Sequence, residues 1–148
     1  MKIKAWHFVG DTLRDGSPIP KDGELLKFYG DIKICERGLH ASKQPFDALQ
    51  YAPGATLCYV SCGGNFMHQN DKFVCTERTI IARMDATELL RYFARMQAVS
   101  CLENWEKEPD AIILDWLMTG DEAARSAAWS AARNEFNQLV YECFEDFL

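Results

Sequence analysis

The chain has 148 residues, of which 48% are hydrophobic and 26% charged, and its formal net charge at neutral pH is −6. This composition is ordinary for a globular protein, and the chain is long enough to bury a core without disulfides or structural metals. No run approaches the roughly 18 apolar residues that span a bilayer, and the first residues lack the apolar segment and cleavage site of a signal peptide. We therefore expect one domain, residues 1–148, in the cytoplasm, with no membrane partner.

The charges are distributed unevenly along the chain. Residues 1–100 contain 13 lysines and arginines against 11 acidic residues, whereas residues 101–148 contain 3 against 11. An asymmetry of this size indicates either an interaction surface or a solvated acidic face. Its sign argues against direct binding of nucleic acid by the C-terminal part and permits a protein partner with a basic surface.

The first half of the chain has the features of short strands separated by turns. Strands are expected at residues 3–9, 32–35, 39–41, 56–61 and 72–84, and residues 24–29 form either a short strand or one helical turn. Gly63-Gly64 is expected to turn the chain into a polar connection that carries His68. Ser42 is a candidate N-cap for a short helix that ends at Pro53-Gly54.

Helical spacing replaces the strand pattern after residue 84. Asp85 and Glu88 resemble a capping box at the start of a helix that runs to about Leu102. Two more helices are expected, one between Pro109 and Gly120 and one from Asp121 to near residue 147. Strands followed by helices predict an α+β fold, in which a mixed or antiparallel sheet (residues 1–84) packs against C-terminal helices (residues 85–148).

Six cysteines occur without a CxxC pair and without zinc-ligand spacing, so we expect reduced thiols and no metal site. Any of them could act as a nucleophile beside a histidine, but the local sequence singles out none. They are Cys35, Cys58, Cys62, Cys75, Cys101 and Cys143.

Three polar residues on predicted strands, His7, His40 and Glu77, are the candidate catalytic residues. A histidine and a carboxylate that meet at strand ends can bind a ribose or act as acid and base. The alternative is structural: half-buried histidines with satisfied ring nitrogens, and a glutamate in a surface ion pair with little effect on stability.

The order and spacing of these residues over residues 3–81 are similar to the ADP-ribosyltransferase fold. The resemblance implies an enzyme that uses NAD, with His7 holding the ribose and Glu77 orienting the attacking group. His40 stands where that family has a tyrosine that stacks on nicotinamide. The sequence has no GxGxxG or P-loop motif, and no cofactor is expected outside this alternative.

The last predicted helix combines acidic residues with an apolar stripe. It is either a core-packing helix with a solvated acidic face or a partner-binding helix that contacts a basic surface or a second copy of itself, giving a homodimer. Its candidate partner-binding residues are Glu135, Glu142, Glu145 and Asp146.

Taken whole, the chain resembles an uncharacterised family of small proteins carried by bacteriophages and prophages. The shared segments are KAWHFV, LRDG, ICERGLHAS, DALQYAPG, DKFVCTERTI, LLRYFAR and TGDEAARSAAWSAAR. The resemblance implies a mobile-element accessory protein in the cytoplasm of a bacterial host. Our leading hypothesis is an inhibitor that binds a host component, such as a CRISPR-type defence complex, through its acidic C-terminal surface. The alternatives are the ADP-ribosyltransferase-like enzyme and a structural or oligomeric phage protein.

Overall fold

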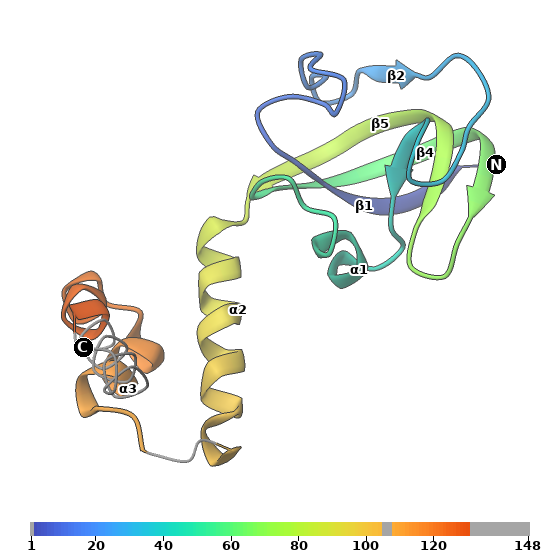
Figure 1. Cartoon of the computed structure of the whole chain (residues 1–148). Coiled ribbons are helices and arrows are strands. Elements are labelled where there is room, and N and C mark those ends of the chain that lie inside the picture. Colours follow the sequence, from blue (N-terminus) through green and yellow to red (C-terminus); the bar gives the residue numbers. More distant parts are fainter. Residues whose placement is uncertain (1, 105–107, 131–148) are drawn as a thin grey trace, which may run out of the picture. The chain divides into compact units, whose positions relative to one another are not determined.

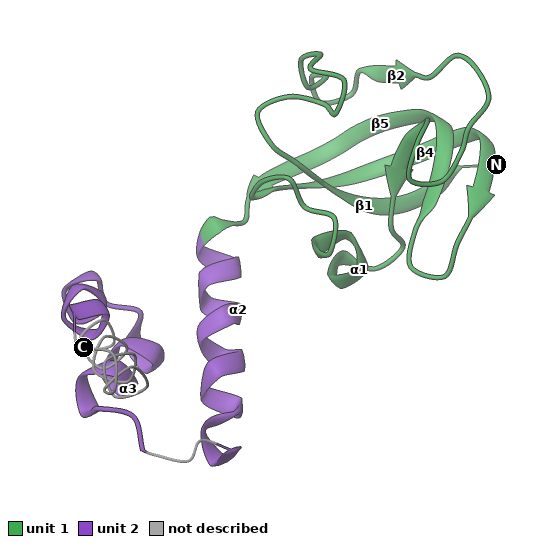
Figure 2. Cartoon of the chain, in the orientation of Figure 1, with its two compact units in different colours: residues 1–87 green, residues 88–148 purple. Residues whose placement is uncertain are grey.

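The computed structural model describes residues 2–104 and 108–130. Contacts divide the chain into two compact units, residues 1–87 and residues 88–148, and each unit is described by itself (Figure 2). The boundary falls where strands give way to helices. The expectation of a single domain, in which the helices cover the sheet, stays a prediction.

An antiparallel five-stranded sheet forms the first unit (Figure 1). Its strands are β1 (Ile3–Val9), β2 (Leu25–Lys27), β3 (Leu39–Ala41), β4 (Thr56–His68) and β5 (Phe73–Asp85). β4 lies between β1 and β5, while β2 and β3 pair with successive segments along the other edge of β5. A short helix, α1 (Pro45–Leu49), follows β3. With the helices of the second unit, this arrangement confirms the predicted α+β class and the antiparallel sheet.

The sheet curls until β3 meets β1. The backbone of Trp6 in β1 exchanges two hydrogen bonds with Ser42, directly after β3, at 2.8 and 2.9 Å. Register shifts between Tyr59 and Val60 and between Gly63 and Phe66 interrupt the β4–β5 ladder. Such bulges bend and twist a strand, and they allow β5 to reach around so that β3 can join both β5 and β1.

The core lies on the inner face of this curled sheet. Along β1, Ala5 and Val9 are buried, so strand alternation places His7 on the same inward face. Arg78 precedes the buried Ile80 by two residues on β5 and is inward for the same reason. The buried cluster is Ala5, Val9, Ala41, Cys58, Val60, Cys62, Phe73, Cys75 and Ile80.

Three local predictions are wrong. The segment expected as a strand at residues 32–35 is a tight turn, with Lys33 and Arg37 paired across it. Gly63-Gly64 does not end its strand but forms a bulge inside β4, because Gly64 adopts a φ of 75°. Ser42 does not cap α1, since its backbone is extended and bonded to Trp6; the N-cap is Gln44.

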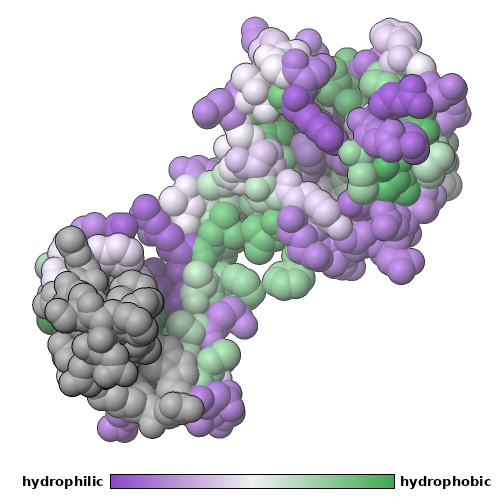
Figure 3. Space-filling model, in the orientation of Figure 1, coloured by the Kyte–Doolittle hydropathy of each residue, from purple (hydrophilic) through white to green (hydrophobic). Residues whose placement is uncertain are grey.

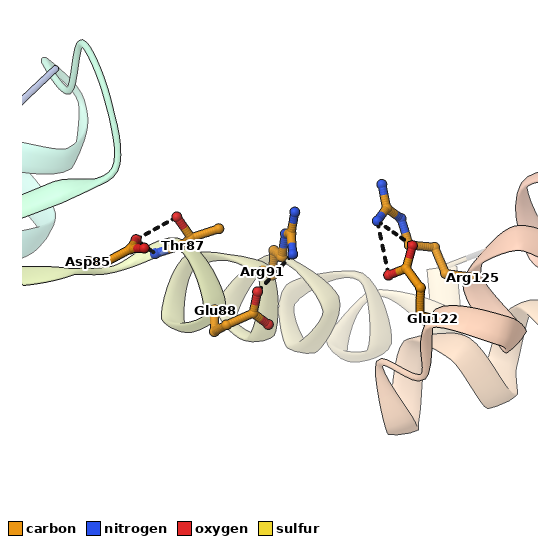
Figure 4. A network of polar contacts seen from close by, with 6 residues as sticks. All are labelled: Asp85, Thr87, Glu88, Arg91, Glu122 and Arg125. Atoms are coloured by element: carbon orange, nitrogen blue, oxygen red, sulfur yellow. Dashed lines mark hydrogen bonds and ion pairs between the residues drawn. The ribbon is translucent and has the colours of Figure 1, made fainter. Parts of the chain in front are cut away.

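The second unit contains α2 (Thr87–Ser100) from its second residue on, a 3-10 turn (Leu102–Asn104), α3 (Ala111–Thr119) and a helical segment at residues 122–130. At the start of α2, the Asp85 carboxylate accepts hydrogen bonds from the backbone N–H and the hydroxyl of Thr87 (Figure 4). The first of these bonds gives a partner to a backbone N–H at the start of the helix, as an N-cap does. Figure 4 also shows the surface ion pairs Glu88–Arg91 and Glu122–Arg125.

Apolar side chains gather along α2 in the space-filling view (Figure 3). Leu89, Tyr92 and Phe93 are exposed there. Among the described helices, none is both long enough and apolar enough to cross a bilayer.

The turn before β3 gives a stability test. Gly38 has a φ of 111°, and a Cβ there would lie 2.9 Å from Ile32 Cγ2 and closer still to Val74 Cγ2. Gly16 also has a positive φ, 83°, but has open space around it. We expect Gly16→Ala to lower the free energy of unfolding by about 1 kcal/mol and Gly38→Ala by about 3 kcal/mol. Urea denaturation of both variants measures this; equal losses would contradict the packing at Gly38.

Candidate functional site

The first unit contains a cavity of about 1000 Å³. This volume is at the upper end of the range for small-molecule sites. Its wall comes from the end of β1 and the loop that follows, from the turn before β3, and from single residues of β5 and of the segments around α1. The polar and ionisable side chains that matter below are His7, His40, Arg78, Lys72, Arg14 and Cys35.

His7 is the histidine of the cavity whose ring remains available. Among the described residues, no side-chain hydrogen bond is formed by its imidazole, although the ring is largely buried on the inner face of β1. Burial, followed by the positive charge of Arg78 and the proximity of His40, lowers the pKa of His7 well below its usual value. The imidazole is therefore neutral at pH 7 and offers one donor and one acceptor.

His40 lies at the same cavity but is tied to the turn in front of it. Its Nε2 accepts a hydrogen bond from the backbone N–H of Cys35 at 2.9 Å, and its carbonyl oxygen accepts one from Arg78. Burial lowers the pKa of His40, against the opposing effect of a hydrogen bond to the Gly38 backbone. Its Nε2 thus has a backbone partner in the turn before β3. This bond joins the ring of His40 to the turn that forms part of the cavity wall.

Arg78 is the dominant charge of the site. Its side chain is only 6% exposed, and its Nη1 donates to the His40 carbonyl at 2.6 Å. Burial lowers the pKa of Arg78, but from so high a value that the guanidinium stays charged. Within the described part of the chain, no carboxylate pairs with it; the titratable groups that act on it are the thiols of Cys62, Cys75 and Cys58.

A second arginine on β5, Arg83, forms an ion pair with a carboxylate, as arginines commonly do. Arg83 pairs with the carboxylate of Asp22 at 2.5 Å and donates to the Pro20 carbonyl at 2.6 Å. It is more exposed than Arg78 and is not part of the cavity wall. Among the described residues, the more exposed arginine, Arg83, therefore has a carboxylate counter-ion, whereas the buried Arg78 has none.

Lys72 adds a second cation with little exposed surface, 9%. Its Nζ lies 3.7 Å from the centre of the Tyr51 ring, a cation–π contact, and the Tyr51 hydroxyl donates a hydrogen bond to Asp71. Burial lowers the pKa of Lys72, but contacts with the Cys35 thiol and the Tyr51 phenol outweigh it and raise that pKa. Lys72 is therefore charged over the whole physiological range.

Two of the acidic residues in the wall are already engaged. The Asp15 carboxylate accepts hydrogen bonds from the hydroxyl and the backbone N–H of Ser17 at 2.6 and 3.0 Å. Glu36 pairs with Lys33 at 2.6 Å. Neither of them pairs with Arg78 or Lys72, and the wall contains a third acidic residue, Asp11.

Glu77 is not brought to this cavity. Because it is next to Arg78 on β5, its side chain points to the other face of the strand. There it pairs with Lys27 of β2 at 3.3 Å and lies over Gly63, whose missing side chain leaves room for the carboxylate. The structure thus groups His7 with His40 and separates Glu77 from both.

The sequence analysis missed Arg78 and Lys72. The signal for Arg78 was its position two residues before Ile80, in phase with the inward face of the strand, whereas Lys72 gave none, because its burial depends on Tyr51. Glu135, Glu142, Glu145 and Asp146 lie outside the described residues. Across residues 2–104 and 108–130, no group of three or more His, Cys, Asp or Glu side chains could hold a metal ion.

These residues can bind an anion and orient it against a neutral imidazole. A guanidinium presents five N–H donors in a planar fork, which matches the oxygens of a phosphate or carboxylate. Arg78 donates one hydrogen bond to the His40 carbonyl and is one of the residues that line the cavity. His7 can donate to, or accept from, a neighbouring ligand oxygen.

The lowered pKa of His7 predicts a pH-dependent stability. Since the unfolded chain takes up this proton at about pH 6.5 and the folded chain only at lower pH, the free energy of unfolding should fall on acidification below that point. The slope from His7 approaches about 1.4 kcal/mol per pH unit. His7→Gln should flatten the profile between about pH 6.5 and the folded pKa, measured by urea denaturation. An unchanged profile would contradict a neutral buried His7.

Comparison with known proteins identifies the family to which the chain belongs. No curated protein and no solved structure matches the chain significantly. Residues 3–92 match the family described as "domain of unknown function (DUF7666)". This match covers every strand of the sheet and the whole cavity wall, and extends into α2. Because it spans more than half of the sequence, the chain belongs to the DUF7666 family.

Proposed function

We propose that the first unit, residues 1–87, is a binding module for a small organic anion, with the cavity around His7 and Arg78 as its site. The observation that carries this proposal is the guanidinium of Arg78, which is buried and has no carboxylate partner in the described part of the chain. Taking an isolated charge out of water is unfavourable by several kcal/mol. A ligand phosphate or carboxylate would offset that cost, since residues 2–104 and 108–130 supply no such group there.

The remaining wall suits an anion attached to an organic body. Phe8, Leu13, Phe28 and Leu39 contribute apolar surface, and His7 and Lys72 supply further polar contacts. Binding sites for small molecules commonly combine a mostly apolar wall with a few convergent polar groups. A single inorganic ion would leave most of the volume unfilled.

ADP-ribosyl transfer, the alternative from the sequence, receives no support from this geometry. That chemistry needs the glutamate at the same cavity as the first-strand histidine, and Glu77 is bonded to Lys27 on the other face of β5. The proposal therefore stops at binding and assigns no catalytic role to His7, His40 or Glu77.

The binding proposal predicts stabilisation by inorganic pyrophosphate, a compact anion that probes the Arg78 fork. At a concentration 100 times its Kd, it should raise the free energy of unfolding by about 2.7 kcal/mol. Arg78→Met should remove this gain. The variant without ligand should differ from wild type by no more than about 1 kcal/mol, because a lost hydrogen bond is offset by removal of a buried charge.

Arg83→Met is the matched control, since it removes the same charge from the same strand but outside the cavity wall. It should lose its ion pair with Asp22 and keep the stabilisation by pyrophosphate. Calorimetric titration and urea denaturation measure both effects. Equal responses of the two variants, or no response of wild type, would overturn the proposal.

The charge asymmetry favours a second candidate for the whole chain. We propose, as the sequence led us to expect, a mobile-element accessory protein that binds a basic host component through the acidic C-terminal region. Reversing the charges of Glu142, Glu145 and Asp146 to lysine should then abolish salt-sensitive capture of one host protein. The fold of the first unit should be unchanged by circular dichroism. Retained capture would remove this candidate, and self-association of the purified protein would favour an oligomeric role.

A further inference from the structure

The edges of β1 and β3 meet at one point and then separate. Trp6 and Ser42 form an antiparallel bridge and exchange two backbone hydrogen bonds, at 2.8 and 2.9 Å. In an antiparallel pair, the next residues to bond in this way would be Phe8 and His40, two positions further along each strand. No bridge between them is found in the part of the chain that the structure describes. Both residues line the cavity, which therefore lies where the two strand edges diverge.

The edge of β1 presents unpaired backbone groups at this opening. The hydrogen bonds of a strand alternate between its two sides, and Trp6 directs its N–H and C=O away from β4, toward Ser42. Phe8 is two residues later and directs its N–H and C=O to the same side. Within residues 2–104 and 108–130, no other group forms a hydrogen bond with either of them. Unpaired edge groups of this kind are a template onto which a further strand can add.

A charged donor lies at the same opening. Arg78 Nη1 donates to the His40 carbonyl at 2.6 Å, where a neighbouring strand would have placed an N–H. Arg78 is 6% exposed, and no carboxylate among the described residues pairs with it. A guanidinium commonly binds a carboxylate through two parallel hydrogen bonds. The end of a peptide chain supplies both of the missing partners, because it carries amide groups that pair with a strand edge and a terminal carboxylate.

The other charges of the wall favour a ligand that carries both signs. Three acidic side chains nearly balance the four cationic ones. Of the acidic ones, Asp11 is the residue without a hydrogen bond or ion pair among the described residues. Asp11 is three positions beyond Phe8, and three extended residues span about 10 Å. A zwitterion about three residues long thus matches the distance along this edge.

We propose that the ligand of the cavity is a short peptide with free termini, which adds to the edge of β1 as an extended strand. Its carboxylate binds Arg78, its amide groups pair with the backbone of Phe8, and its ammonium group faces Asp11. The inference rests on the proposed function, since it names the class of organic anion that the same site binds. Main-chain pairing of this kind gives affinity that does not depend on the sequence of the peptide.

Three ligands of similar length test the inference. Triglycine carries an ammonium group, amides and a carboxylate; 8-aminooctanoate has the same two ends but no amide; triglycinamide has no carboxylate. Calorimetric titration of the full chain gives the Kd of each. We expect triglycine to bind about tenfold more tightly than 8-aminooctanoate, a factor that one or two added hydrogen bonds supply. It should exceed triglycinamide by about tenfold or more, because a charge-assisted pair is lost. Equal Kd values for triglycine and 8-aminooctanoate would overturn the inference.

Variants assign the two ends of the peptide. Arg78→Met should remove the preference for triglycine over triglycinamide, whereas Arg83→Met, the matched change on β5, should keep it. Asp11→Asn should weaken the binding of triglycine but not that of N-acetyltriglycine, which has no ammonium group. Equal effects of the two arginine variants, or equal effects of Asp11→Asn on the two peptides, count against the inference.

Pyrophosphate separates this inference from the proposed function. Stabilisation by pyrophosphate that depends on Arg78, together with equal binding of triglycine and 8-aminooctanoate, rejects the peptide and keeps the anion site. No response of wild type to pyrophosphate or to any of the peptides rejects both proposals.

Discussion

The pairing of β4 with β5, thirteen residues each, is the interaction on which the rest of the first unit depends. Every other strand joins one of these two, and their bulges give the ladder the curvature that closes β3 onto β1. The curvature also decides which residues become interior. It encloses three thiols and Arg78 from β4 and β5, and brings His7 from β1 to face them.

The sequence predicted the class and most of the strands because these depend on local pattern, but it ended β4 at residue 61 instead of His68. Alternation and turn residues were enough for β1, β3 and β5, and the capping group of Asp85 marked the change to helices. Closure of the sheet was not predictable, because it depends on a backbone contact between Trp6 and Ser42 and on a bulge at Gly64. From the local sequence alone, a pair of glycines predicts a turn and not a bulge within a strand.

The sequence predicted which histidines line the cavity, but not their hydrogen bonds, because those depend on how distant segments meet. His7 and His40 were found by residue type and strand position, but the sequence could not distinguish an open imidazole from one whose Nε2 is bonded to a turn. Glu77 was chosen for its chemistry, although its neighbour Arg78 occupies the inward face. Adjacent strand residues face opposite ways, and only the position of the bulge decides which one enters the core.

The bond between Arg78 and the His40 carbonyl joins residues 38 positions apart in sequence. Contacts of such long range form late, because chain entropy must be lost before they stabilise anything. A nascent chain that has been synthesised only through β4 has His7, His40 and Cys35 but no Arg78. The proposed binding of an anion by Arg78 therefore requires a first unit whose sheet is complete, and a ligand there would distinguish a finished domain from every shorter intermediate of its own synthesis.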